Sequence, residues 1–229
     1  MNIALIVAGG TGNRMGLDIP KQFVLVNNKP ILIYTIEAFL KHPQIDDIYL
    51  VIHQDYLDEV NGWIKTYNLN KVKAVIKGGE TRQISVFNGL KEMKRNGVKD
   101  DDIILIHDAA RPLVNSTIIS NNISTCQKYG AAVTSLGATD TILLSTKEDK
   151  LNDILNRDEI YLEQTPATFK FDIIYQAHQN VKDNQSTDDC GLVMNLGKDI
   201  HLVKGDRYNF KITTIEDLKL FELLKKKED

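Results

Sequence analysis

The sequence contains little of what cross-links, anchors or exports a protein. Its two cysteines, Cys126 and Cys190, are too few for a disulfide framework and lack the spacing of metal ligands. No run approaches the roughly 20 apolar residues of a membrane span, and residues 1–4 enter an apolar run without a basic leader. With 28 basic and 31 acidic side chains, the net charge of −3 gives no general attraction to nucleic acid or anionic membranes. We therefore expect a cytoplasmic globular protein that binds neither nucleic acid nor a membrane.

Apolar runs alternate with amphipathic helical patterns along the 229 residues. This alternation is typical of βαβ units, which place helices on the faces of a mostly parallel sheet. The predicted strands are 3–7, 48–52, 72–76, 103–106, 131–136, 201–203 and 210–212. The predicted helices are 31–41, 56–67, 84–93, 118–128, 172–181, 188–195 and a last one that opens with the capping-box sequence 213–216. The expected fold is α/β, a Rossmann-like three-layer sandwich formed by a single domain, 1–229.

The pattern changes between residues 139 and 158. Residues 141–146 and 151–155 have the pattern of short strands joined by the polar turn 147–150, which predicts a β-hairpin. Isolated hairpins are marginally stable in water, and this one carries apolar side chains that two strands alone cannot cover. We therefore expect 139–158 to be a protruding arm that packs against a second copy of the chain.

A glycine-rich loop follows the first predicted strand. Residues 8–16 are Ala-Gly-Gly-Thr-Gly-Asn-Arg-Met-Gly, and Pro-Lys-Gln follows at 20–22. Glycines let the backbone approach a ligand and point amide N–H groups at it, and Arg14 and Lys21 add two cations, so the loop suits a polyphosphate. It lacks the ending of a Walker A loop, and Met15 stands where a dinucleotide fingerprint needs its third glycine. A plain tight turn between strand and helix is the alternative.

Two further clusters follow predicted strands. Residues 78–85 are Gly-Gly-Glu-Thr-Arg-Gln-Ile-Ser, whose amides and Ser85 hydroxyl suit the edge of a nucleobase, although a simple turn has the same pattern. His-Asp-Ala-Ala-Arg-Pro begins at His107, at the carboxyl end of a buried strand, where ligands bind in open α/β sheets. Asp108 there suits Mg²⁺ or a ribose hydroxyl and Arg111 suits a phosphate, unless the two form only a structural ion pair. His107 is expected to be a packed strand-end residue outside the chemistry.

Polar groups also lie at four later element junctions, 156–158, 164–166, 186–189 and 209–211. Taken singly, none of them supports a functional role. Thr187 suits a helix N-cap. Lys211 lies in a short apolar run, where a lysine is either an edge residue or is aimed into a cleft.

Taken together, these blocks resemble the cytidylyltransferase family typified by 2-C-methyl-D-erythritol 4-phosphate cytidylyltransferase, which also contains the ribitol 5-phosphate cytidylyltransferases. The blocks follow the family's order over essentially the whole chain, and they include Arg-Gln-Ile-Ser-Val-Phe-Asn-Gly-Leu at 82–90 and Ala-Thr-Asp-Thr-Ile at 138–142. His-Asp-Ala-Ala-Arg-Pro is similar to the methylerythritol branch, whereas Tyr208 and residues 156–161 are closer to the ribitol branch. Ala167 stands where the family usually has glutamine.

The resemblance implies transfer of CMP from CTP to a polyol phosphate, with release of pyrophosphate and Mg²⁺ as cofactor. The catalytic cations that it implies around the α-phosphate are Arg14, Lys21 and Lys211. The implied nucleotide contacts are Ala8, Gly9, Gly10, Gly12, Gly79, Ser85 and Asp108, with Asp108 also facing the metal. The implied acceptor contacts are Arg111, Thr165 and Thr187, joined by Thr141 and Arg157 from the arm of the partner in a homodimer.

The acceptor is the open part of this interpretation. We expect 2-C-methyl-D-erythritol 4-phosphate, and ribitol 5-phosphate for teichoic acid or capsule synthesis is the alternative. The same fold also suits a uridylyl- or guanylyltransferase for sugar 1-phosphates, or a regulatory protein that only binds a nucleotide. The cations Arg14, Lys21 and Lys211 argue against pure binding, because a binder does not need cations at the reacting phosphorus.

Overall fold

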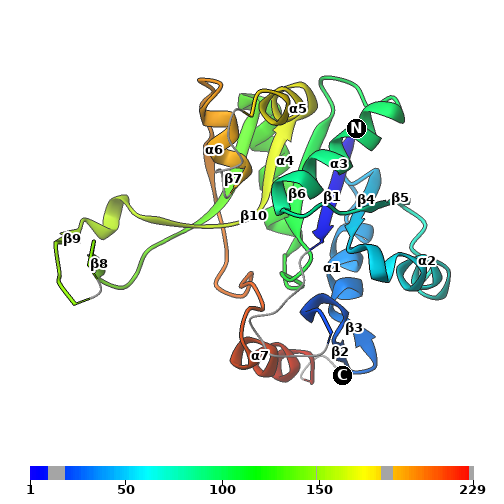
Figure 1. Cartoon of the computed structure of the whole chain (residues 1–229), viewed down its shortest axis with the longest axis horizontal. Coiled ribbons are helices and arrows are strands. Elements are labelled where there is room, and N and C mark those ends of the chain that lie inside the picture. The colour runs from blue at the N-terminus through cyan, green and yellow to red at the C-terminus, as the bar shows by residue number, and fades with distance from the viewer. Residues whose placement is uncertain (10–18, 148, 182–187, 227–229) are drawn as a thin grey trace.

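The computed structural model describes residues 1–9, 19–147, 149–181 and 188–226. Within them, the main sheet has seven strands in the order β11-β7-β10-β6-β1-β4-β5 (Figure 1). The strands are β1 (Asn2–Ala8), β4 (Asp47–Ile52), β5 (Val72–Lys77), β6 (Ile103–Asp108), β7 (Ala131–Gly137), β10 (Tyr161–Lys170) and β11 (His201–Lys204). Neighbouring strands are parallel, except that β10 runs antiparallel to β6 and β7.

Helices cover both faces of this sheet. They are α1 (Ile31–Leu40), α2 (Leu57–Thr66), α3 (Arg82–Arg95), α4 (Ser116–Tyr129), α5 (Phe171–Gln179), α6 (Asp189–Met194) and α7 (Ile215–Lys226). Successive side chains of a strand point to opposite faces, so Leu5 and Ile6 of β1 belong to different cores. Ile6 packs in the core formed with α1, α2 and α4, and Leu5 in the core formed with α3, α5 and α6. The predicted α/β three-layer architecture is confirmed.

A third, smaller cluster lies below the sheet, beside α7. Short elements precede α1 here, namely η2 (Lys21–Phe23), β2 (Leu25–Val26) and β3 (Lys29–Pro30). Phe221 of α7 is fully buried against Ile31 and neighbouring apolar side chains. The cap of α7 lies one residue later than predicted, because the carboxylate of Asp217 rather than Glu216 accepts hydrogen bonds from the backbone N–H of Thr213 and Thr214.

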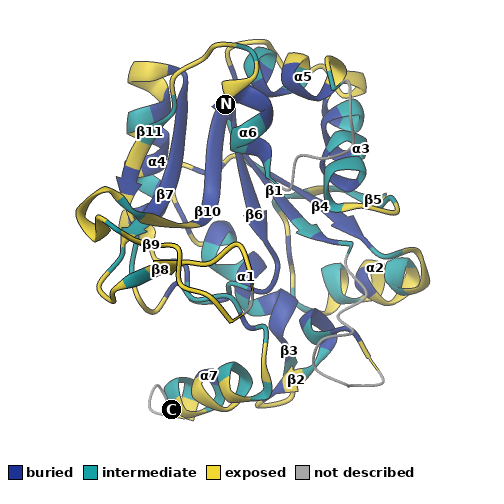
Figure 2. Cartoon of the chain, turned by 60° about the vertical axis from the view of Figure 1, so that its left-hand side comes forward, coloured by how far each residue is buried: buried dark blue, intermediate teal, exposed yellow. Residues whose placement is uncertain are grey.

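The hairpin between β7 and β10 is present and protrudes. Strands β8 (Ile142–Leu144) and β9 (Asp153–Leu155) pair antiparallel in a separate two-stranded sheet, which Figure 1 shows extending away from the main sheet. The short helix η4 (Arg157–Glu159) follows, and η3 (Gln54–Tyr56) precedes α2. Figure 2 shows the arm as mostly exposed, and the exposed apolar side chains on it are Leu143, Leu144, Leu151 and Ile154. The predicted protruding hairpin is confirmed.

Two further predicted details are wrong. Residues 210–212 are not a strand, because Ile212 donates one backbone hydrogen bond to Ala110 and its neighbours pair with no strand of the sheet. Strand β10, by contrast, is absent from the prediction: its sequence places Pro166 inside the strand, and its pairing with β7 shifts register between Glu163 and Ala167. Among the described helices, none is both long and apolar enough to cross a bilayer.

Candidate active site

The carboxyl ends of four parallel strands lie at one edge of the sheet. Ala8 at the end of β1 is in register with Ile52 of β4, which pairs in turn with Lys77 of β5. On the other side of β1, Val7 is in register with Asp108 of β6. This is the edge where ligands bind in open α/β sheets. The three clusters singled out in the sequence therefore begin side by side.

The loops after β1 and β5 approach each other closely. A Cβ atom on Gly9 would lie 2.8 Å from Oγ of Ser85, and one on Gly78 would lie 3.2 Å from the same oxygen, so the approach requires glycine. The buried Ser85 hydroxyl accepts a hydrogen bond from the Gly79 amide at 3.0 Å and donates to the Thr81 carbonyl at 2.9 Å. The expected nucleotide residues of these two loops are thus brought together.

Lys21 is held beside the first loop by the next residue. Gln22 in η2 is buried, and its Nε2 donates a hydrogen bond of 3.0 Å to the carbonyl of Ala8 at the end of β1. This bond ties the backbone at Lys21 to the start of the glycine-rich loop. Lys21 itself is half-buried there.

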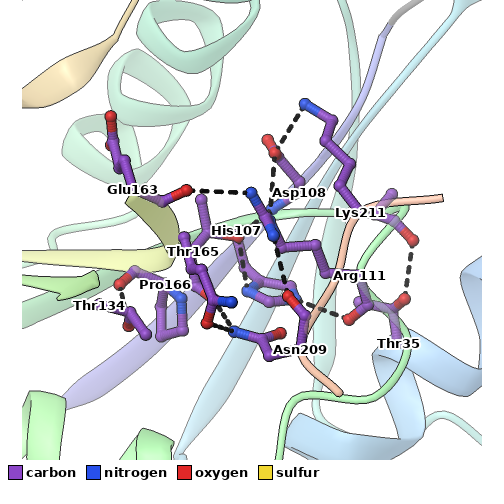
Figure 3. A network of polar contacts seen from close by, with 12 residues as sticks. Thr35, His107, Asp108, Arg111, Thr134, Glu163, Thr165, Pro166, Asn209 and Lys211 are labelled. Atoms are coloured by element: carbon purple, nitrogen blue, oxygen red, sulfur yellow. Dashed lines mark hydrogen bonds and ion pairs between the residues drawn. The ribbon is translucent and has the colours of Figure 1, made fainter. Parts of the chain in front are cut away.

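Asp108 is surrounded by three cations (Figure 3 shows two of them). Nζ of Lys211 lies 2.8 Å from Oδ2, and Nε of Arg111 lies 3.8 Å from the same oxygen. Nε of Arg82 lies 3.4 Å from Oδ1. Burial raises the pKa of Asp108, but Lys211 and Arg82 outweigh it and hold that pKa well below its usual range. Asp108 is therefore ionised near neutral pH, and the ion pair with Arg111 weighed from the sequence exists within a larger cluster.

His107 and Thr165 fix the backbone behind Asp108. Nε2 of His107 donates to the Arg111 carbonyl at 3.1 Å, because a carbonyl oxygen can only accept. Nδ1 then accepts the Thr165 hydroxyl proton at 3.0 Å, and the same hydroxyl accepts from the Asp108 amide at 3.1 Å. Burial lowers the pKa of His107 to about 4, so the ring is neutral. It packs at the strand end, which agrees with the expectation that it lies outside the chemistry.

A buried asparagine holds the segment that carries Lys211. Asn209 donates from Nδ2 to the Gln164 side chain at 3.1 Å and to the Thr165 carbonyl at 2.9 Å. Its own carbonyl accepts a hydrogen bond of 2.8 Å from Nη1 of Arg111 (Figure 3). Lys211 follows two residues later, and its ammonium contacts Asp108 at the carboxyl end of β6, so it is not the edge-strand residue that the sequence allowed.

Some expected site residues fall elsewhere or outside the description. Gly10, Gly12, Arg14 and Thr187 lie outside the described residues. Thr141 and Arg157 are exposed on the arm, where Nη1 of Arg157 donates to the Thr139 carbonyl at 3.3 Å. Figure 1 shows β8 and β9 of that arm extending away from the main sheet, and among the described residues no hydrogen bond or ion pair joins Arg157 to Asp108.

One possible metal-ligand group exists in the described part of the chain. Side-chain ligand atoms of Glu163, Asp188 and Cys190 lie within 4.8 Å of one another, and Asp108 is not part of this group. The carboxylate of Asp108 is paired with cations instead. It could supply only one protein ligand to a metal ion, so most ligands to an ion there would have to come from a phosphorylated substrate.

Arg82 is the main site residue that the sequence interpretation left without a role. Besides contacting Asp108, its Nη1 lies 2.7 Å from Oδ2 of the buried Asp189. Arg82 is also the first residue of α3, where a positive charge opposes the helix dipole. A cation at that unfavourable position, three residues after the Gly78-Gly79 pair, is the signal in the sequence that would have identified it.

A Rossmann-like sheet with clustered cations at its carboxyl edge defines a protein that binds phosphorylated ligands. The comparisons narrow this class. Residues 2–226 match the family described as "IspD: 2-C-methyl-D-erythritol 4-phosphate cytidylyltransferase". The chain is 42% identical over 228 residues to 2-C-methyl-D-erythritol 4-phosphate cytidylyltransferase of Clostridium botulinum, covering 99% of this chain and 98% of the relative. It is 39% identical over 234 residues to ribitol-5-phosphate cytidylyltransferase of Lacticaseibacillus paracasei, covering 100% of both.

Solved structures agree with the sequence comparisons. The crystal structure of 4-diphosphocytidyl-2C-methyl-D-erythritol synthase from Anaerococcus prevotii superposes with a TM-score of 0.84 at 26% identity, covering 99% of this chain and 98% of that one. The chain belongs to the IspD cytidylyltransferase family. It is therefore an enzyme of the nucleotidyltransferase class, and the family resemblance drawn from its motifs is confirmed.

Proposed function

We propose that this chain transfers CMP from CTP to 2-C-methyl-D-erythritol 4-phosphate and releases pyrophosphate. The observation that carries the proposal is the cation cluster of Lys211, Arg111 and Arg82 around Asp108, on the same sheet edge as Gly79 and Ser85. One side of this edge suits a nucleobase and the other suits phosphates. Family relatives named for this activity cover the whole chain.

The reaction brings two anions together, and cations address that difficulty. An oxygen of the acceptor phosphate attacks the α-phosphorus of CTP; the new P–O bond forms as the bond to the leaving pyrophosphate breaks. The oxygen is already ionised at neutral pH, so a strong general base is not needed. Negative charge gathers on the α-phosphate in the transition state, where preorganised cations stabilise it most. Lys211 takes this role with Lys21, and with Arg14, which lies outside the described residues.

The nucleotide half of the site is assigned to the loops after β1 and β5. Gly79 and Ser85 would recognise cytosine, because they lie at the strand ends beside Gly9, and the Ser85 oxygen, which accepts from the Gly79 amide, keeps a second acceptor position for a base. Backbone amides of Ala8 and Gly9, with Gly10 and Gly12 beyond the described part, would line the triphosphate.

The acceptor half includes a contribution from a second subunit. Arg111 and Thr165 lie beside Asp108 and, with Thr187, would face the polyol phosphate. Thr141 and Arg157 are too remote in their own chain, so we assign them to the site of the partner in a homodimer. The exposed apolar side chains of the arm support this assembly, since a lone hairpin does not cover them.

Mg²⁺ is the proposed cofactor, held by Asp108 together with the triphosphate. The ionised Asp108 carboxylate fits this role, because Mg²⁺ is commonly held by one or two carboxylates plus substrate phosphates. When bound, the ion neutralises charge on the phosphates. We also place the protein in the cytoplasm, where reduced thiols such as Cys126 and Cys190 persist; both are free of disulfides in the structure.

Ribitol 5-phosphate is the second candidate acceptor. A relative of that name is 39% identical over the full length, close to the 42% of the methylerythritol relative. The sequence at 156–161 also favours the ribitol branch. Both acceptors are short dianionic polyols, and the same cations suit either.

The proposal is tested by following pyrophosphate release with each of the four nucleoside triphosphates and each acceptor. We expect turnover with CTP at least about 100-fold above that with UTP, GTP or ATP, as a site built to hydrogen-bond one base rejects the others. A preference for UTP or GTP would disprove cytidylyl transfer. CTP binding without turnover on either acceptor would indicate a nucleotide-binding protein.

A further inference from the structure

A continuous chain of polar contacts leads from the reacting edge of the sheet to the helices behind it. Asp108 contacts Nε of Arg82 at 3.4 Å, and Nη1 of Arg82 contacts Oδ2 of Asp189 at 2.7 Å. The other oxygen of Asp189, Oδ1, lies 3.1 Å from Nε2 of His178 in α5. Three secondary-structure elements, β6, α3 and α6, are thus connected to α5 through ionic or hydrogen-bonding groups.

The inner end of this chain is buried and rigidly packed. The side chains of His178 and Asp189 are only 1% and 2% exposed. The His178 ring stacks on Phe87 of α3, with 5.8 Å between ring centroids and 15° between planes. A carboxylate can only accept, so Nε2 of His178 donates to Asp189, and each Asp189 oxygen has one donor. Both side chains are therefore closed off from any ligand at the sheet edge.

The outer end has a donor left for a ligand. The described contacts of Arg82 use Nε and Nη1, and the described residues give Nη2 no hydrogen-bond partner. The side chain is 30% exposed, on the edge where Asp108 lies. Arg82 is therefore held on two sides while its guanidinium remains accessible from the site.

We propose that His178 and Asp189 are positioning residues that fix the Arg82 guanidinium for binding the phosphate of the acceptor beside Asp108. The inference rests on the proposed function and adds to it a cation and its support. His178 fixes Asp189 by occupying Oδ1, and Asp189 fixes Arg82 by occupying Nη1. Asp189 is also the first residue of α6, so the same ion pair ties α6 to α3.

The test compares His178→Phe, which keeps an aromatic ring against Phe87 but removes the donor, with His178→Gln, which restores a donor near the Nε2 position. His201→Phe is the matched control, because His201 also stacks on an aromatic ring, Tyr129 at 3.7 Å, but lies in β11 at the far edge of the sheet. Each variant is assayed for kcat and for the KM of CTP and of the acceptor. Heteronuclear NMR of the Arg82 Nε–H group, assigned with Arg82→Lys, reports its hydrogen exchange without any turnover.

Loss of a hydrogen bond to a charged group is worth about tenfold or more, so His178→Phe should lower kcat/KM for the acceptor about tenfold and speed Arg82 Nε–H exchange by a similar factor. The KM for CTP should change less than about twofold, because the residues assigned to cytosine, Gly79 and Ser85, do not contact His178. His178→Gln should recover most of the loss in acceptor kcat/KM and most of the slow exchange of the Arg82 Nε–H. Unchanged exchange in His178→Phe, or equal losses in both His178 variants with an equally lowered Tm, would overturn the proposal. If the wild type turns over neither acceptor, the proposed function fails, and the exchange measurement still decides whether His178 positions Arg82.

Discussion

Removing Lys211 separates the catalytic role of the cation cluster from its structural role. In Lys211→Ala, the ammonium that lies 2.8 Å from Oδ2 of Asp108 is lost. Removing one preorganised electrostatic group from a phosphoryl-transfer site costs about 3–4 kcal/mol of transition-state stabilisation, or about 10²–10³ in kcat. We expect a loss of this size for CTP and the polyol phosphate.

The same substitution should leave the fold nearly as stable. Asp108 keeps Arg82 at 3.4 Å and Arg111 at 3.8 Å, so its carboxylate is not left unpaired. The Lys211 side chain is 36% exposed, but Asp108 is only 12% exposed, so we expect the loss of this ion pair to cost about 1–2 kcal/mol after solvent screening. For a chain of this length, that corresponds to a Tm shift of about 2–8 °C.

The assay is steady-state pyrophosphate release, together with thermal unfolding of the same samples. Lys204→Ala is the matched control, because Lys204 is an exposed lysine in β11, a strand at the far edge of the sheet. It should retain wild-type kcat. The reasoning is refuted if Lys211→Ala keeps more than about a third of wild-type kcat, since preorganised cations at the phosphorus are worth far more than that. A Tm loss above about 10 °C would show instead that Lys211 acts through the fold.

Three further predictions follow from the arm and from the buried histidine. Arg157→Ala should raise the acceptor KM about 10–100-fold by removing charge-assisted hydrogen bonds while leaving the KM of CTP unchanged, and unchanged acceptor kinetics would remove the arm from the site. Ile154→Asp places a charge on the exposed apolar arm and should shift the protein from dimer to monomer in sedimentation velocity; identical sedimentation of variant and wild type would contradict the arm-mediated dimer. His107 has a pKa lowered to about 4, so the unfolded chain binds an extra proton below about pH 6.5, and this group should remove about 2 kcal/mol of stability between pH 7 and pH 5. Urea unfolding at both pH values checks this, and a His107→Gln variant with the same pH slope as wild type would argue against it.

Most of the fold could be predicted from the sequence because its apolar runs are long and alternate regularly with helical patterns. Continuous apolar runs identify the buried strands β1, β4, β6 and β7 directly. The bounds of these strands differ from the predicted ones by only a few residues. The sequence did not predict β10, because Pro166 lacks a backbone N–H and polar residues precede it. This segment becomes a strand through its pairing with the neighbouring strands β6 and β7. For residues 210–212 the sequence predicts a strand that does not form, because their apolar side chains pack on α7 and not in the sheet.

The site was predicted where chemistry follows directly from residue type and strand ends. Asp108, Arg111, Gly79 and Ser85 each follow a predicted strand, and parallel strands bring such residues to one edge. The supports were not predictable in the same way. Gln164, Asn209 and the partners of Arg82 act through contacts between segments far apart in the sequence, and only the folded chain shows them.

The most direct test of cytidylyl transfer to a polyol phosphate is a competition assay read by mass spectrometry. The protein is incubated with CTP, Mg²⁺ and equal concentrations of 2-C-methyl-D-erythritol 4-phosphate and ribitol 5-phosphate, and the CDP-linked products are quantified. We predict that CDP-methylerythritol exceeds CDP-ribitol by at least about tenfold, the discrimination that a hydrogen-bonding pocket readily supplies. Predominant CDP-ribitol would contradict the proposed acceptor, and the absence of both products would contradict the proposed reaction.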